Sequence, residues 1–374
     1  MIAPLIRSEA DSIEQLGTLS PAVVGALRDS NLFWLLLPTE FGGGGQGIVA
    51  MLEVLEEISC ADGSTGWALM ANAGSIALAA CAMSSEGLHD LFQEKNKAIT
   101  AGQLLPVGRA TKVDGGYIAS GRFSFASGSA HADQIGAGFF VEADGQRVIG
   151  EDGAPQTIVG LFPRSDVTFL GNWDVSGLVG TGSFDYEIDQ VFVPDHLTFD
   201  LMAATTRPEP VFTLGAYGIG LAGHAGVALG LMKRSLQEVA RITDGKTRAV
   251  YPGRVDEHPL FLDAFAKHEA LYQAARAFVM QAYGDAEATA AAGQALTTEQ
   301  QSRFRQALAW STSAAADVVR FAHTWSGTQS FRNPSAVGRA YRDISVATQH
   351  LHVDPIAYTL AAQPVLDAWR HTND

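Results

Sequence analysis

The chain has 374 residues, of which 47% are hydrophobic and 17% charged, so it can bury a large core and is not a disordered polymer. Its 40 acidic residues outnumber its 25 basic ones, which gives a formal net charge of -15 at pH 7, and no stretch concentrates Lys or Arg. We therefore expect no nucleic-acid partner, because a polyanion needs a positively charged surface. By length alone, the chain holds two or three domains.

The two cysteines and the first residues indicate where the protein works. Cys60 and Cys81 lie in apolar, helix-like sequence without a second Cys or His at zinc-ligand spacing, so we expect buried free thiols and no metal site. The opening sequence MIAPLIRSEADSIEQ lacks the long apolar core of a signal peptide, and no run of 18 apolar residues occurs. We expect a soluble, cytoplasmic protein that does not insert into a membrane.

Residues 1–97 read as helices. Ser20 followed by Pro21 is typical of a helix start, and Asp62 precedes a second helical stretch, TGWALMANAGSIALAACAM. Between them, a glycine run at 42–45 breaks the chain before the helical sequence IVAMLEVLEEISC. We expect an N-terminal helical domain over this range.

Residues 98–205 read as strands, and residues 206–374 read as helices again. The middle range contains short apolar runs such as QIGAGFFVEA and SFDYEIDQVFVP, separated by turns such as the DGG sequence at 114–116. The last range is rich in alanine, has a 3.6-residue periodicity, and divides into about four helices. Strands between two blocks of helices predict an α+β fold with a middle β-barrel or sandwich and a C-terminal four-helix bundle.

Two glycine-rich stretches, at 42–47 and 218–223, match the pattern G-x-G-x-x-G. Neither follows a convincing strand within a βαβ unit, which a dinucleotide site requires. The first is more typical of a loop, and the second of close helix packing. We therefore expect no nicotinamide-binding domain in this chain.

The stretch FSFASGSAHAD, residues 123–133, begins as an alternating strand and ends in small, hydroxyl-bearing side chains. Either it turns in an ordinary serine-rich loop, or it leaves room for a flat, amphipathic ring that needs apolar surface and hydrogen bonds. His131, at the end of this stretch, reads as a surface or locally bonded group outside any site.

A family resemblance supports the second interpretation. The segments GGYIASGRFSFASGSAHAD and GNWDVSGLVGTGSFDYEIDQVFVP resemble the middle domain of the acyl-CoA dehydrogenase superfamily, while LLLPTEFGGGG and EEISCADGSTGW resemble its first domain. The resemblance covers nearly the whole chain and implies a helical domain, a β-barrel and a four-helix bundle that enclose FMN or FAD. It places against the flavin a set of residues from the middle domain, together with one arginine from a loop between bundle helices: Phe125, Ala126, Ser127, Gly128, Trp173, Thr181, Ser183 and Arg248.

An acyl-CoA dehydrogenase needs a carboxylate base over the flavin, and this sequence lacks one where the family holds it. No glutamate follows Glu299, and the start of the first bundle helix, LGAYGIGLAGHAG, contains no acid. Asp343, within RAYRDI, reads as a salt-bridged structural acid rather than as a base. The sequence therefore favours another chemistry on the same fold.

The late segment NPSAVGRAYRDISVATQHLHVDP, residues 333–355, is similar to flavin-dependent monooxygenases of the same superfamily. These include the oxygenase components of two-component aromatic and steroid hydroxylases, such as p-hydroxyphenylacetate hydroxylase. The similarity implies that reduced flavin, supplied by a separate reductase, reacts with O2 to a C4a-hydroperoxide that hydroxylates a small aromatic or polycyclic substrate. It assigns catalytic roles to Ser127, beside the flavin N5, and to His350, as a base.

His352 lies two positions after His350, and on a helix such rings point to different faces, so we expect at most one of them in the site. On the substrate side, the resemblance places Trp67, Asn72 and Phe321. It also implies a homotetramer. Two alternatives stay open: an acyl-CoA dehydrogenase or oxidase with a displaced base, and an N- or S-oxygenase of the same superfamily.

Overall fold

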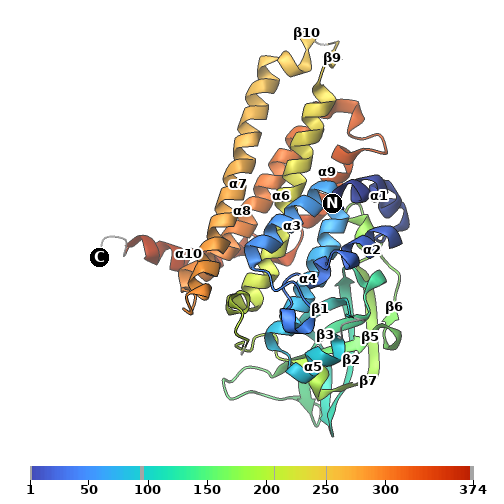
Figure 1. The fold of residues 1–374 in the computed structure, drawn as a ribbon, viewed down its shortest axis with the longest axis vertical. Coiled ribbons are helices and arrows are strands. Elements are labelled where there is room, and N and C mark those ends of the chain that lie inside the picture. The colour runs from blue at the N-terminus through green and yellow to red at the C-terminus, as the bar shows by residue number, and fades with distance from the viewer. Residues whose placement is uncertain (1, 93–96, 206, 250, 371–374) are drawn as a thin grey trace.

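A computed structural model gives the fold of residues 2–92, 97–205, 207–249 and 251–370 (Figure 1). A β-sheet forms one end of the molecule, long helices extend to the other, and the N-terminal helices pack where the two meet. The expected order of helices, strands and helices is confirmed. The elements fall within the three expected domain ranges, and whether each range is a separate folding unit stays a prediction.

The N-terminal helices begin where the sequence predicts caps. The Ser20 hydroxyl accepts a hydrogen bond from the N–H of Val23 at 3.4 Å, and the Asp62 carboxylate accepts one from the N–H of Thr65 at 2.8 Å. The helices are α1 (Ala3–Leu16), α2 (Pro21–Asp29), α3 (Ile48–Ala61), α4 (Gly63–Ala82) and α5 (Ser85–Leu91).

The middle range forms a mixed sheet in the order β6-β7-β2-β1-β3-β5-β8, with β4 paired to β3. Neighbours are antiparallel except β1 and β3, which run parallel. Within the described residues, the outer strands β6 and β8 do not pair with each other, so hydrogen bonds do not close the mixed sheet into a complete ring. The strands are β1 (Thr100–Val113), β2 (Gly116–Ala126), β3 (Gln134–Ala143), β4 (Gln146–Arg147), β5 (Thr157–Pro163), β6 (Thr168–Phe169), β7 (Phe184–Pro194) and β8 (Thr198–Phe199).

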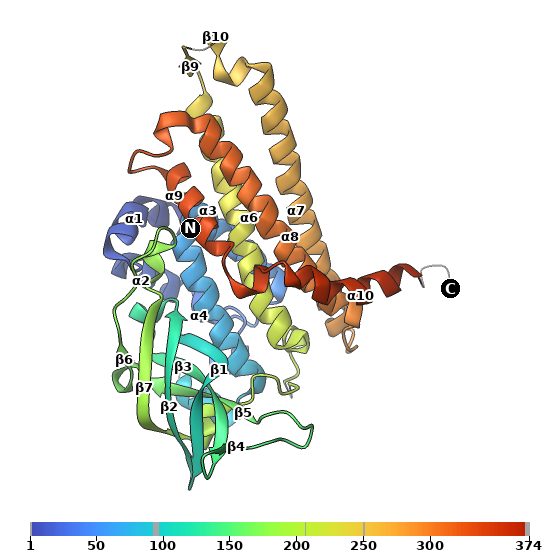
Figure 2. The ribbon, with the colours of Figure 1, turned by 180° about the vertical axis from the view of Figure 1, so that it is seen from behind.

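Long helices make up most of the C-terminal range. Helices α6, α7 and α8 run side by side, α9 packs against α6 and α8, and α10 crosses α8 and then projects away from the rest (Figures 1 and 2). A small hairpin, β9–β10, joins α6 to α7 at the end of the bundle opposite the sheet. The elements are α6 (Gly215–Thr243), β9 (Thr247–Arg248), β10 (Tyr251–Arg254), α7 (Pro259–Ala291), α8 (Thr298–Ser326), α9 (Ala336–Ala347) and α10 (Ile356–Arg370).

The second glycine-rich stretch permits α6 to approach the N-terminal helices closely, as predicted. A Cβ added at Gly223 would lie 2.2 Å from Cγ of Met70 on α4. Farther along α6, beyond this stretch, a Cβ at Gly230 would lie 2.5 Å from the carbonyl oxygen of Glu56 on α3. The contact at Gly223 brings α4, which carries Trp67, against the part of α6 that carries His224.

Among the residues that the structure describes, two helical segments are long and apolar enough to cross a membrane, Gly63–Ala82 and Pro210–Thr243. In their most apolar windows, 78% and 72% of the residues are buried inside the molecule. Burial of this kind is expected of the core helices of a folded domain.

Candidate active site

Strand β2 ends in a turn whose backbone is unusual. Phe125 has a positive φ of 64°, although it is not a glycine, and its side chain is 68% exposed. The following residues turn back toward β7, because the N–H of Gly128 donates to the carbonyl of Thr181 at 2.8 Å. Strain of this kind persists only where the surrounding contacts hold it, and it is common at functional sites.

The small size of Gly128 in this turn makes room for a protein side chain, that of Asn72, rather than for a ligand. A Cβ at Gly128, whose φ is +75°, would lie 2.4 Å from the side-chain oxygen of Asn72. Asn72 is fully buried, donates to the carbonyl of Thr100 at 2.8 Å, and shares a 3.0 Å hydrogen bond with His131. Asn72 therefore ties α4 to the sheet, and its polar groups already have protein partners.

Ser127 belongs to a line of buried hydroxyl groups. Its oxygen lies 2.7 Å from the Ser183 hydroxyl, which lies 2.7 Å from the Thr181 hydroxyl. Thr181 in turn donates to the carbonyl of Leu178 at 2.8 Å, and the indole N–H of Trp67 donates to Ser127 at 3.2 Å.

The two ends fix the direction of this line. The carbonyl of Leu178 can only accept, so the single proton of Thr181 is committed to it, and Thr181 must accept from Ser183. By the same logic, Ser183 accepts from Ser127. The order of donation is therefore from Trp67 through the three hydroxyls to a backbone carbonyl. We call these groups the hydroxyl chain.

On its other side, Trp67 contacts a cluster of three imidazole rings. The ring centroids of His224 and His350 are 4.1 Å apart, and that of His352 lies 5.0 Å from His350 and 5.7 Å from His224. The Trp67 ring meets His224 edge-on at 5.1 Å and His350 at 5.7 Å. We call the three the imidazole cluster. Trp67 thus joins it to the hydroxyl chain.

The imidazole cluster is uncharged at neutral pH. Burial lowers the pKa of His350 to about 4, with a further contribution from His352. Burial and the two neighbouring imidazoles hold the pKa of His224 well below its usual 6.5, and burial also lowers the pKa of His352. The rings therefore act through neutral N–H groups and lone pairs.

Sequence reasoning missed His224 and misplaced the two late histidines. His224 is a lone histidine on the glycine- and alanine-rich helix α6. Its position as a polar residue in apolar sequence was the one feature of the sequence that could have marked it as functional. His350 does not lie on a helix: it follows α9 with extended backbone angles, φ -71° and ψ 139°. The expectation that His350 and His352 lie on a helix with their rings on different faces is wrong for that reason, and both rings belong to the cluster.

Asp343 is not the salt-bridged acid that the sequence indicated. One carboxylate oxygen accepts from the N–H of Leu178 at 2.6 Å, and the other has no hydrogen-bond partner among the described residues. The nearby guanidinium of Arg339 pairs with Asp11 and Glu14 instead. Asp343 thus holds the turn on which the hydroxyl chain ends.

Two further candidates, Phe321 and Arg248, lie away from the hydroxyl chain. Phe321 on α8 stacks on His268 of α7, with ring centroids 4.3 Å apart. Arg248 lies in the β9–β10 hairpin, at the far end of the bundle from the sheet, and donates to the carbonyl of Trp325 at 2.6 Å. The fold of a single chain does not bring either residue to Ser127.

The residues around Ser127 fit a flat cofactor with a polar edge. The exposed Phe125 ring meets the half-buried Trp173 ring edge-on, 6.4 Å between centroids, and both flank the turn that carries Ser127. Such exposed aromatic surface beside buried hydroxyl groups suits an isoalloxazine ring, which is apolar on its faces and hydrogen-bonds along its edge.

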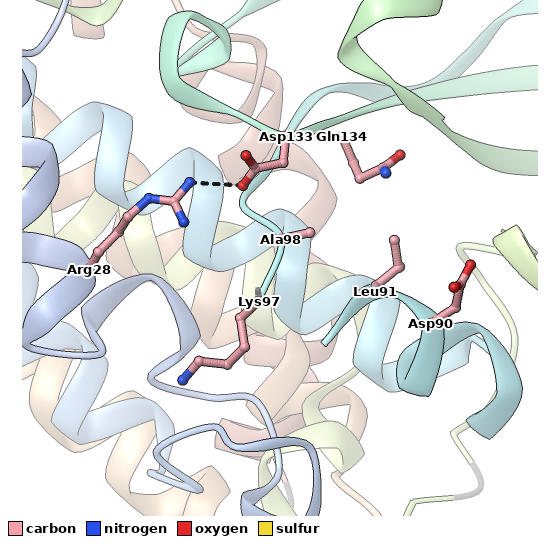
Figure 3. A pocket seen from close by; sticks show the side chains of 7 residues that line it. All are labelled: Arg28, Asp90, Leu91, Lys97, Ala98, Asp133 and Gln134. Carbon is pink, nitrogen blue, oxygen red and sulfur yellow. Dashed lines mark hydrogen bonds and ion pairs between the residues drawn. The ribbon is translucent and has the colours of Figure 1, made fainter. Parts of the chain in front are cut away.

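A cavity of about 320 Å³ lies elsewhere, between α2, the end of α5 and the start of β3 (Figure 3). Its cationic groups are engaged by the protein: Arg28 pairs with Asp133 at 2.8 Å, and Lys97 donates to the carbonyl of Gly42 at 2.7 Å. None of the predicted site residues lines this cavity. Its lining is mainly polar and consists of Arg28, Asp90, Leu91, Lys97, Ala98, Asp133 and Gln134.

Known proteins match this chain along nearly its whole length. The acyl-CoA dehydrogenase N-terminal domain matches residues 2–88, and the acyl-CoA dehydrogenase C-terminal domain matches residues 222–355. Indole-3-acetate monooxygenase of Pseudomonas putida is 28% identical over 94% of this chain and 88% of that protein. The oxygenase subunit HsaA, a flavin-dependent monooxygenase of Rhodococcus jostii, is 25% identical, and the match covers 95% of this chain and 93% of the HsaA chain.

Solved structures agree with these sequence relatives. The HsaA monooxygenase of M. tuberculosis superposes with a TM-score of 0.86, at 25% identity, and the match covers 96% of this chain and 93% of that one. The chain therefore belongs to the acyl-CoA dehydrogenase superfamily, in the branch of flavin-dependent monooxygenases that act as oxygenase components.

Proposed function

We propose that the site around Ser127 and His350 hydroxylates a small aromatic or polycyclic molecule, with reduced FMN or FAD supplied by a separate reductase. When bound, the reduced flavin supplies the electrons that activate O2, so the protein's part is to bind, orient and exclude water. The observation that carries the proposal is the hydroxyl chain, which leaves Ser127 in a single hydrogen-bonding state.

In this proposal, Ser127 acts as an acceptor. Its own proton is committed to Ser183, and one of its lone pairs receives the indole N–H of Trp67. The remaining lone pair can accept from an N–H on the edge of the flavin ring. Phe125 and Trp173 supply the apolar surface beside it. Ser127 would thus hold a proton on the ring rather than give one to it.

We assign His350 to the substrate side of the site, because its ring contacts those of both Trp67 and His224. An uncharged imidazole in a dry pocket can bind a polar substituent without the desolvation cost of a full charge. Asn72, Phe321 and Arg248 are not part of the proposed site.

We further propose that the protein works in the cytoplasm as a homotetramer. Helix α10 projects from the bundle (Figure 2). It exposes apolar side chains that a lone chain would leave in water. Those on α10 with more than two-fifths of their surface exposed are Ile356, Tyr358, Leu360, Leu366 and Trp369. A neighbouring copy would cover them.

The test is oxygen insertion from isotope-labelled O2. The protein is mixed with photoreduced FMN and an aromatic acid such as indole-3-acetate or 4-hydroxyphenylacetate, and the product is analysed by mass spectrometry. We expect one labelled oxygen atom per product molecule, and less product with more hydrogen peroxide for Ser127→Ala. Ser124→Ala, on the same strand, is the matched control. Oxidation of an acyl-CoA without any labelled product would instead support a dehydrogenase with a displaced base.

A further inference from the structure

Arg305, on α8, is a half-buried cation without a partner of opposite charge. No ion pair or hydrogen bond joins its guanidinium to any residue that the structure describes. Every other arginine of comparable burial in the described chain has an acidic side chain or a carbonyl oxygen as partner. A guanidinium that has lost part of its hydration and has gained no acceptor binds an anion more strongly than a fully hydrated one.

The surroundings of Arg305 hold it in place without satisfying its N–H groups. Helix α8 packs against both α6 and the turn after α9. From α6, Tyr217 holds the centre of its ring 4.5 Å from the guanidinium carbon. Such a ring attracts the cation but accepts no conventional hydrogen bond, so the N–H groups stay available to a ligand. Tyr217 is itself 47% exposed, which leaves the pair open to an incoming molecule.

Arg305 also lies beside the imidazole cluster. From the turn after α9, His352 comes near enough that the positive charge of Arg305 helps to lower its pKa, after the larger effect of burial. Trp67, which leads to the hydroxyl chain, contacts the other two rings, those of His224 and His350. The hydroxyl chain and the cation therefore meet the cluster at different rings. Because the rings are uncharged at neutral pH, the charge of Arg305 is not opposed or neutralised by them.

From this placement, and resting on the function proposed above, we propose that Arg305 binds a carboxylate group of the substrate and that Tyr217 positions the guanidinium. Two parallel N–H groups of a guanidinium match the two oxygens of a carboxylate. The aromatic ring of such a substrate would lie against the imidazole cluster, on the side of Ser127. Since the rings of the cluster separate Trp67 from Arg305, the substrate is an aromatic acid whose carboxylate is carried on a short arm.

The same cation discriminates between acids and their uncharged analogues. A primary amide has nearly the shape of a carboxylate, but it carries no charge, and its NH2 group would face the N–H donors of Arg305. Donors that face each other where water is partly excluded leave at least one group unpaired. An aromatic amine, once protonated, would meet a like charge. The site thus prefers an aromatic acid to its amide and rejects the amine.

The test measures binding without turnover, so that it separates this inference from the proposed function. The probes are 2-naphthylacetate and 2-naphthylacetamide, which share a ring system and differ in charge. Isothermal titration calorimetry in the presence of oxidised FMN gives the affinity of the protein for each probe. We expect wild-type protein to bind the acid at least about tenfold more tightly than the amide, as one charge-assisted contact allows.

Two variants and a matched control are all on α8. Arg305→Gln keeps hydrogen-bond donors but removes the charge, so the affinity ratio of acid to amide should fall close to one while the affinity for the amide stays the same. Arg305→Lys keeps the charge without the planar fork and should give an intermediate ratio. Arg303→Gln removes a cation that already pairs with Glu299 at 3.0 Å, and its ratio should match that of wild type.

The phosphate group of the flavin is a second possible anion for Arg305, and a further titration distinguishes it from the substrate. FMN carries this phosphate and riboflavin lacks it. We expect Arg305→Gln to bind both flavins as wild type does. A loss of affinity for FMN but not for riboflavin would assign the guanidinium to the cofactor phosphate and would overturn the inference.

Wild-type protein that does not prefer the acid, whether it binds both probes equally or neither, would also overturn the inference, even where labelled oxygen enters a neutral aromatic molecule. The same holds for a preference that survives in Arg305→Gln. The comparison of two probes on wild-type protein needs no substitution, so a variant that fails to fold does not rescue the inference. A preference for the acid that depends on Arg305, together with no oxygen insertion, would count against the proposed function alone.

Discussion

Replacing Asp343 by asparagine should make the stability of the protein less sensitive to a rise in pH from acidic to neutral values. The Asp343 side chain is 2% exposed, and one of its carboxylate oxygens has no hydrogen-bond partner among the described residues. Burial raises its pKa to about 7, and the charge of the neighbouring buried Asp62 adds to the effect. Above that pH, the folded protein must hold a charged carboxylate in a nearly dry place.

The sign and size follow from linkage. The usual pKa of an aspartate is 3.8, so between about pH 4 and pH 7 the folded chain binds a proton at Asp343 that the unfolded chain has already released. The free energy of unfolding therefore falls as pH rises through this window, and it levels off above pH 7. A difference of about three pKa units corresponds to about 4 kcal/mol lost from this group.

The asparagine side chain would keep an oxygen that accepts from the N–H of Leu178 and would remove the ionisation. Urea unfolding at pH 5 and pH 8 measures the free energy of unfolding. We expect Asp343→Asn to lose less stability between the two pH values than wild type, by about 3 kcal/mol at most, because pH 5 already lies inside the window. Asp189→Asn, an exposed position on β7, should behave like wild type. Equal losses in Asp343→Asn and wild type would refute the reasoning.

Three further substitutions test the site and its surroundings. Gly128→Ala should lower the free energy of unfolding by about 1–3 kcal/mol in urea titrations, because the methyl group meets Asn72 and φ is positive. Trp67→Phe keeps an aromatic ring but removes the N–H that Ser127 accepts, so oxygen insertion should slow about tenfold in stopped-flow assays while the thermal midpoint stays unchanged. Leu360→Asp, on the exposed face of α10, should reduce the assembly size in light scattering with helicity retained in circular dichroism.

Local sequence patterns predicted much of the fold. Helix caps at Ser20 and Asp62 were predictable because a cap and the N–H it binds lie within three residues of each other. The closure of the sheet was not, because it depends on whether β6 and β8, far apart in the chain, meet. Within the described chain these two strands do not pair, so the hydrogen-bonded ladder of the mixed sheet is not closed.

In the candidate site too, the local features could be predicted from the sequence, and the contacts between distant segments could not. The hydroxyl-rich end of β2 is one contiguous stretch and could be recognised from its composition. The imidazole cluster takes His224 from α6 and two histidines from the segment after α9, and only the packing of α6 against α9 brings them together. A lone histidine in a helix rich in glycine and alanine carries no sign of such distant partners.

Residue type also left the direction of the hydrogen bonds undetermined. A serine donates and accepts equally well, so the sequence could place Ser127 beside a flavin but could not say which it would do. The direction is set by a backbone carbonyl, that of Leu178, whose own N–H is held by Asp343. In the imidazole cluster, the carbonyl of Gly220 has the same effect on His224. At both places, a main-chain group that can form only one kind of hydrogen bond decides what an ambivalent side chain offers to a ligand.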